Sequence, residues 1–266
     1  MHALLKSGLL GNNETPSLGM VQFDCHSCKL GKSKVLPFLV HTSHVIAPFH
    51  LIHSDVWGMA PITSHANYKY FVTFIDDYSR FTWIYFLHSK NEVFSVFKIF
   101  YAYVQTQFST KIKILRSDNG GEYTSHLFQD FLQNHGIIHQ RSCPSTPQQN
   151  GVAERKNRHL LDMVRTLLLE SSTPSRFWYE ALSTAVYLIN RLPSPILNHD
   201  SPHVRLFGHP PTYSNLRTFG CVCYVLRDRE PVGKFDAKSD VGVFLGYSNN
   251  SRAYRVYENP NCYGIS

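Results

Sequence analysis

The sequence predicts an α/β fold built on a mixed β-sheet, followed by a small β-rich module. Two β-rich runs, at 69–75 and 81–87, flank a short turn and come early in the chain. Strands and amphipathic helices then alternate up to about residue 200, which is typical of a sheet with helices on its faces. From about residue 201 the chain changes to short runs that alternate with turn residues.

The two early runs predict an antiparallel hairpin. Residues 69–75 and 81–87 are rich in aromatic and β-branched residues, and the turn between them is Asp76–Arg80. Residues 90–107 follow with apolar side chains at helical intervals, so they predict an amphipathic helix that covers the sheet. The aromatic residues of this helix are expected in the core and not on a nucleic-acid surface.

The remaining elements of the central part are assigned from apolar periodicity and from their end signals. They are strands at 51–52 and 112–115, a helix at 124–135, a strand at 137–138, and helices at 151–170 and 174–193. Gly136 is expected to stop the first of these helices, while Pro174 and Pro193 bound the last one. This order predicts that the sheet is mixed.

The C-terminal part is expected to begin with a linker. Pro202, Pro210 and Pro211 mark it, and the runs 221–226 and 241–247 read as small strands. The predicted organisation is therefore an N-terminal segment at 1–45, a core at 46–200 and a β-rich segment at 201–266, where the chain is expected to be truncated.

Composition excludes several classes of protein. A length of 266 residues allows one sizeable core plus smaller modules, and 43% apolar residues exclude a mostly disordered chain. The formal net charge of +7 favours a polyanionic partner. With no signal peptide and no long apolar run, the six cysteines indicate a reducing intracellular compartment and no membrane partner.

Three acidic residues stand out by their settings. Asp55 follows the predicted strand at 51–52, and Asp118 follows the one at 112–115, so both are expected at strand ends. Glu154 lies at the front of the predicted helix that begins at residue 151. The spacing of the three acids would be weak evidence alone, because acidic pairs at such offsets recur by chance.

Converging carboxylates need a cation. Two of them about 5 Å apart repel by roughly 3 kcal/mol at an effective dielectric of about 20. Oxygen ligands suit Mg²⁺ or Mn²⁺, and two such ions can activate the attacking oxygen and stabilise the leaving oxygen of a phosphodiester. The alternative is that each acid only caps a helix or fills a turn, for which Asp118 before Asn119 and two glycines is well suited.

Five strings carry a family resemblance: DDYSRFTWIYFL, RSDNGGEY, TPQQNGVAERKNR, LRTFGCVCYV and GVFLGYS. Together they resemble the integrase region of a copia-type LTR retrotransposon Pol polyprotein, over nearly the whole chain. The resemblance implies a ribonuclease H-like catalytic core with a mixed five-stranded sheet and flanking helices. It places the catalytic, metal-binding triad on Asp55, Asp118 and Glu154, and it excludes the nearby Glu122.

The implied function is that of a DNA integrase, a polynucleotidyl transferase. With two Mg²⁺ or Mn²⁺ ions it would process the 3′ ends of the element's DNA and transfer them into target DNA. The resemblance also implies a homo-multimer as the active form and action in the nucleus. Two alternatives stay open: a metal-dependent nuclease that joins nothing, and an inactive transposon remnant that only binds nucleic acid.

Basic residues accompany Glu154. Arg155, Lys156 and Arg158 crowd the first turns of its helix, whose N-terminal dipole also favours phosphate, so they predict contacts with the DNA backbone. Asn150, in the preceding loop, is expected at the DNA end. The alternative is an ordinary solvated helix face. Further basic residues expected to aid DNA binding lie in the C-terminal module: Lys234, Lys238, Arg252 and Arg255.

The N-terminal segment contains half of a zinc site. Cys25 and Cys28 form a C-x₂-C pair, and a tetrahedral site needs two more ligands. The resemblance implies a pair of upstream histidines, but only His2 precedes the cysteines. We therefore expect residues 1–45 to be a truncated zinc-binding segment that does not hold zinc stoichiometrically. The alternative is two ordinary thiols in a loop.

Overall fold

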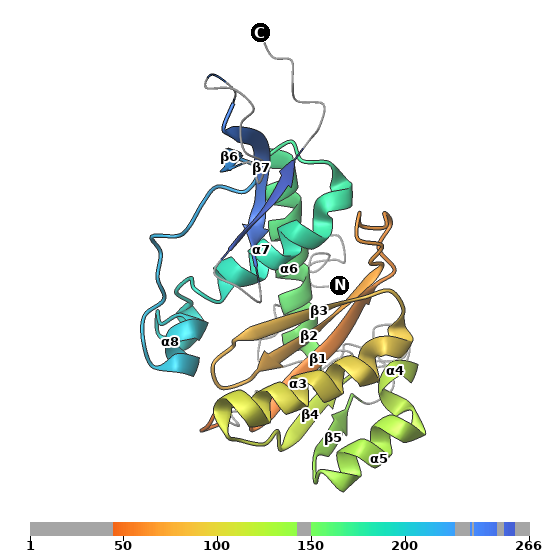
Figure 1. The fold of residues 1–266 in the computed structure, drawn as a ribbon. Coiled ribbons are helices and arrows are strands. Elements are labelled where there is room, and N and C mark those ends of the chain that lie inside the picture. The colour runs from red at the N-terminus through yellow and green to blue at the C-terminus, as the bar shows by residue number, and fades with distance from the viewer. Residues whose placement is uncertain (1–44, 143–149, 227–234, 236, 249–252, 259–266) are drawn as a thin grey trace, which may run out of the picture. The chain divides into compact units, whose positions relative to one another are not determined.

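The structure is a computed structural model that describes residues 45–142, 150–226, 235, 237–248 and 253–258. These residues form a five-stranded sheet with helices on both faces and a separate three-stranded sheet (Figure 1). Among them, no helix has both the length and the apolar character needed to cross a membrane.

The five-stranded sheet has the order β3-β2-β1-β4-β5. Its strands are β1 (Leu51–Gly58), β2 (Tyr70–Asp76), β3 (Thr82–Leu87), β4 (Ile114–Ser117) and β5 (Ile138–Arg141). The central strand β1 pairs antiparallel with β2 and parallel with β4, so the predicted mixed sheet is confirmed. The parallel pairing requires a crossover, which the helix after β3 provides.

One face of the sheet packs against α3 (Val93–Phe108) and α5 (His126–Asn134). The core on this face is rich in phenylalanine: Phe74, Phe97, Phe100 and Phe128 are fully buried. The aromatic residues of α3 are therefore core residues, as the periodicity predicts. A short 3-10 helix, η1 (Lys90–Glu92), leads into α3, and α4 (Gly121–Thr124) precedes α5.

The opposite face packs against α6 (Gly151–Glu170) and α7 (Trp178–Ile189). Figure 1 shows α3 and α6 on opposite sides of the sheet. Phe71 of β2, Leu160 of α6 and Ala185 of α7 are fully buried in this second core. Since Phe71 faces α6 while Val72 faces α3, the strands alternate between two covered faces.

The three-stranded sheet consists of β6 (Val222–Leu226), β7 (Ser239–Tyr247) and β8 (Tyr254–Glu258) in sequence order. Leu245 of β7 belongs to the same core as α6 and α7, and the rings of Tyr247 and Tyr187 stack 3.9 Å apart. The sheet is thus packed on α7. The sequence predicts β6 and β7 but misses β8.

Several predicted boundaries are wrong. Asp55 lies in the middle of β1 and not at a strand end, because the β-forming residues Val56 and Trp57 continue the pairing with β2 to Gly58. The helix predicted at 124–135 is confirmed as α5, whose Ser125 cap accepts a hydrogen bond from Phe128 N, while the short α4 before it is not predicted.

The region around Pro202 is also wrongly predicted. The sequence reads as a linker there, but η4 (Pro195–Leu197) and α8 (Pro202–Phe207) form. Ser201 accepts a hydrogen bond from Val204 N, and Pro202 occupies the first turn of α8, where a missing N–H costs nothing. The last predicted helix, at 174–193, is η3 (Ser175–Phe177) followed by the shorter α7.

Candidate active site

Asp55 is held in place by an amide side chain. The partly buried Asp55 carboxylate accepts a hydrogen bond at Oδ2 from Asn157 Nδ2 of α6, at 2.8 Å. Asn157 in turn accepts at Oδ1 from Thr73 Oγ1 of β2, at 3.1 Å. Thr73 is the register partner of Asp55 across the sheet. The three residues therefore connect β1, β2 and α6 and fix the orientation of the carboxylate.

Asn157 is a site residue that the sequence interpretation misses. It is 3% exposed and shares the buried stripe of α6 with Ala153, Leu160 and Val164. A polar side chain inside an apolar stripe is the signal that could have identified it, because a buried amide needs hydrogen-bond partners.

Asp118 directly follows β4, which lies parallel to β1. His53 and Arg116 are register partners in this pair, so Asp55 and Asp118 each lie two residues further along and on the same side. Asp118 Oδ1 accepts a hydrogen bond from Gly120 N at 3.0 Å. The predicted turn role is therefore present together with the position beside Asp55.

Glu154 completes the acidic group from the first turn of α6, which packs on β1 and β2. Burial first, and then the negative charges of Asp118 and Glu154, raise the pKa of Asp55 to about 6, while the Asn157 hydrogen bond opposes them. The three carboxylates thus share one electrostatic environment. In the described part of the chain, however, no three His, Cys, Asp or Glu side chains are gathered closely enough to hold a metal ion.

Hydrogen bonds from both sides of the sheet hold β1, the strand that carries Asp55. Ser54 Oγ and Tyr123 Oη lie 2.6 Å apart, and Tyr123 is fully buried. From the other face, Asn150 Nδ2 donates to Ser54 O at 3.2 Å. Asn150 is 1% exposed, so here it supports β1, and a contact between Asn150 and DNA stays a prediction.

The predicted basic residues differ in their surroundings. Arg155 and Arg158 are exposed on α6, whereas Lys156 is partly buried. Burial, together with the nearby charge of Arg80, lowers the pKa of Lys156 to about 8. Glu122 Oε1 pairs with Lys90 Nζ at 3.3 Å.

Two sets of predicted residues lie outside the described residues. Cys25 and Cys28 fall before residue 45, so the structure does not test the zinc prediction. Lys234 and Arg252 of the C-terminal module also fall in undescribed segments, while Arg255 lies on β8 with its guanidinium against Tyr179.

Comparison with known proteins identifies the domains. Two family models match: the integrase core domain, over residues 46–147, and the retroviral polymerase SH3-like domain, over residues 221–261. The chain therefore carries an integrase core domain followed by a retroviral polymerase SH3-like domain, and the three-stranded sheet lies within the second.

Similar proteins include two plant Pol polyproteins, which confirms the resemblance to copia-type Pol polyproteins. The retrovirus-related Pol polyprotein from transposon RE2 of Arabidopsis thaliana is 43% identical over 260 residues, covering 97% of this chain. The Pol polyprotein from transposon TNT 1-94 of Nicotiana tabacum is 42% identical over 234 residues, covering 88% of this chain. The chain spans only 18% of the length of each of these relatives.

A solved structure shares the integrase fold. It is a chain of the simian T-cell lymphotropic virus intasome in complex with PP2A regulatory subunit B56 gamma. The TM-score is 0.55 at 16% identity, with 88% of this chain and 84% of that chain covered. At this identity the likeness shows the fold alone. The predicted ribonuclease H-like fold with a mixed five-stranded sheet is confirmed.

Proposed function

We propose that this chain cuts and joins DNA as a metal-dependent integrase core. The observation that carries the proposal is that Asp118 follows β4 beside Asp55 of the parallel strand β1, while Glu154 lies in the first turn of α6, the helix packed on β1. Uncompensated negative charge of this kind is what a divalent cation would relieve, and an all-oxygen donor set suits Mg²⁺ or Mn²⁺.

The two aspartates are prepared for such a ligand role. Asp55 Oδ2 accepts a hydrogen bond from Asn157 and Asp118 Oδ1 accepts one from Gly120 N, so both carboxylates are oriented by the protein itself. When bound, two divalent ions lower the pKa of the attacking water or hydroxyl and stabilise the leaving oxygen. Asn157 and Thr73 hold the Asp55 carboxylate steady through the reaction.

The proposal includes the partners and the place of action. DNA would be bound both as the element's ends and as the target, with Arg155 and Arg158 on the exposed face of α6 contacting phosphates. A homo-multimer would be the active form, acting in the nucleus. Residues 46–200 would form the catalytic core, and 201–266 would aid DNA binding. The names of the relatives and of the intasome neighbour support this assignment.

A joining assay tests the function. The chain is incubated with Mn²⁺, labelled duplex DNA carrying the terminal sequence of the element, and an unlabelled target plasmid. Labelled plasmid is the expected product. Cutting without joining would favour the metal-dependent nuclease, and binding without either reaction would favour the inactive remnant. Undiminished joining by Glu154→Gln would contradict the assigned site.

A further inference from the structure

A row of polar side chains crosses the sheet beside the acidic triad. His53 of β1, Arg116 of β4 and Gln140 of β5 occupy paired register positions. Arg116 donates from Nε and Nη2 to Gln140 Oε1, at 3.1 and 2.6 Å. Asp55 and Asp118 lie two residues further along the first two strands. At about 3.3 Å per residue, the row is about 7 Å from the triad.

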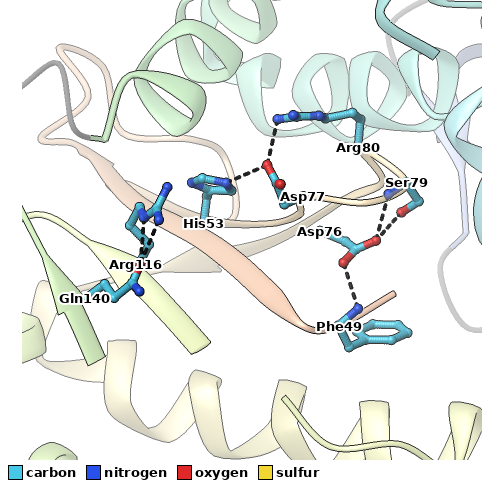
Figure 2. A network of polar contacts seen from close by, with 8 residues as sticks. All are labelled: Phe49, His53, Asp76, Asp77, Ser79, Arg80, Arg116 and Gln140. Atoms are coloured by element: carbon cyan, nitrogen blue, oxygen red, sulfur yellow. Dashed lines mark hydrogen bonds and ion pairs between the residues drawn. The ribbon is translucent and has the colours of Figure 1, made fainter. Parts of the chain in front are cut away.

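Asp77, in the turn after β2, has basic side chains around it next to this row. Figure 2 shows Arg80 and Arg116 on either side of the His53–Asp77 pair. Asp77 Oδ1 lies 2.9 Å from His53 Nε2 and 3.1 Å from Arg80 Nη1. Arg116 is also within electrostatic range of Asp77. Since the His53 side chain is 1% exposed and that of Asp77 is 13% exposed, the arrangement is fixed by burial.

Lys156 adds a third cation from α6. Its side chain is partly buried and lies within electrostatic range of the Arg80 guanidinium. Asp77 pairs with Arg80 and lies within electrostatic range of Arg116, and Lys156 adds a third positive charge beside Arg80. Like charges held together in partly buried positions are costly, and a bound anion would relieve them.

We propose that Arg80, Arg116 and Lys156 form a binding site for one phosphate group of DNA beside the acidic triad. Asp77 and His53 are positioning residues that hold Arg80 in place. The inference rests on the proposed function in one respect, namely that DNA is the ligand. It adds Arg80 and Arg116, two residues outside the helix that carries Glu154, to the surface that grips the substrate.

A DNA phosphate fits this location and this chemistry. Each DNA strand carries one phosphate per about 3.4 Å of helix axis. A phosphate one or two nucleotides from the reacting one is therefore within reach of the row, which lies about 7 Å from the triad. Arginine guanidinium groups are suited to phosphate because their N–H donors form a planar fork. In the described structure Arg116 uses Nε and Nη2 for Gln140, which leaves Nη1 for a ligand.

The test measures coupling between a side chain and one phosphate. The probe is a short duplex with the element's terminal sequence, in which each phosphate near the reacting 3′ end is replaced in turn by an uncharged methylphosphonate. We expect wild-type protein to lose about tenfold in affinity at one position, the loss of one charge-assisted hydrogen bond. Arg80→Gln and Lys156→Gln should bind about tenfold more weakly and no longer respond to that replacement.

Arg165→Gln is the matched control. Arg165 also lies on α6, but it is exposed and paired with Asp162, so this variant should keep the wild-type response at every position. Thermal melting shows whether Arg80→Gln folds. Lys156→Gln, in a different element, tests the same phosphate site independently. An unchanged pattern of responses in both variants would overturn the phosphate site. Absence of joining with the coupling intact would overturn the proposed function alone.

Discussion

The three carboxylates are the residues on which catalysis is expected to depend. Asp55→Asn, Asp118→Asn and Glu154→Gln should each abolish cutting and joining, because each removes the charge of a metal ligand. The fold should persist, since mutual repulsion is removed as well. Joining assays measure the loss. Mn²⁺ should raise the melting temperature of wild-type protein and not that of Asp55→Asn, since a ligand stabilises only the state that binds it.

Asn157 should act through Asp55. In Asn157→Ala the carboxylate loses its hydrogen bond, and we expect joining to fall roughly 10–100-fold, as for other residues that orient metal ligands. Thr73→Val gives a graded comparison, because Asn157 loses its other partner while Asp55 keeps its hydrogen bond to Asn157, so the effect should be smaller. Its joining rate should stay within a few-fold of wild type. Equal losses in both variants would mean that general destabilisation causes the effect.

At the residue scale the sequence identifies the acids but not what holds them. Asp55 and Asp118 follow recognisable apolar runs, and Glu154 begins a periodic helix. The Asn157 bond joins residues far apart in the chain, and it depends on which face of β1 α6 covers. No local pattern contains that information.

At the scale of the elements, α7 carries a buried acid against its neighbours. Glu180 is 4% exposed, its Oε1 lies 3.2 Å from His65 Nδ1, and no described group pairs with its Oε2. Burial raises the pKa of Glu180 to about 7 and lowers that of His65. Both shifts favour the neutral forms of the two side chains.

This acid should make stability depend on pH. The folded-state pKa of Glu180 lies above its ordinary value of 4.5, so its contribution is present below pH 4.5 and is lost as pH rises through about 7. Glu180→Gln should therefore be more stable than wild type at pH 8, by about 1–3 kcal/mol, and not at pH 4. Urea unfolding at both values measures this. The exposed Glu170→Gln is the control, and a pH-independent difference for Glu180→Gln would contradict the assignment.

The element boundaries show where local signals suffice. The hairpin and α6 follow their periodicity closely, and Asp76 stabilises the hairpin turn by accepting from Ser79 N and Phe49 N, at 2.9 and 2.8 Å. Strand β8 is missed, because pairing with β7 and not composition defines its residues. The prolines before α8 suggest a linker, although Pro202 preceded by Ser201 is also a helix start.

At the scale of the molecule, the three-stranded sheet depends on a close approach to α7. Gly246 has a φ of +123°, and a Cβ there would lie 2.4 Å from Thr184 Oγ1. Gly246→Ala should therefore cost about 2–4 kcal/mol, from overpacking and backbone strain together. Gly208→Ala is the control: its φ is +76°, but nothing lies within 4 Å, so about 1 kcal/mol is expected. Urea unfolding followed by tryptophan fluorescence compares them, and equal costs would refute the close packing.

The whole chain carries a net charge of +7, so we expect its affinity for DNA to come largely from contacts with phosphates. Phosphate contacts release counterions, so affinity should fall steeply with salt, with a slope that scales with the number of phosphates neutralised. Sequence preference should be weak, because such contacts do not read bases. Arg158→Gln, at an exposed position of α6, should reduce the slope by about one unit.

Binding titrations at several salt concentrations measure this slope for each variant. The triad variants should bind about as well as wild type, because removing acids removes no phosphate contact. Arg165→Gln, whose arginine is paired with Asp162, should leave the slope unchanged. If Arg158→Gln behaves like Arg165→Gln, the face of α6 beyond Glu154 is merely solvated. The phosphate contacts would then come from residues nearer the sheet, where Arg80 and Arg116 flank the His53–Asp77 pair.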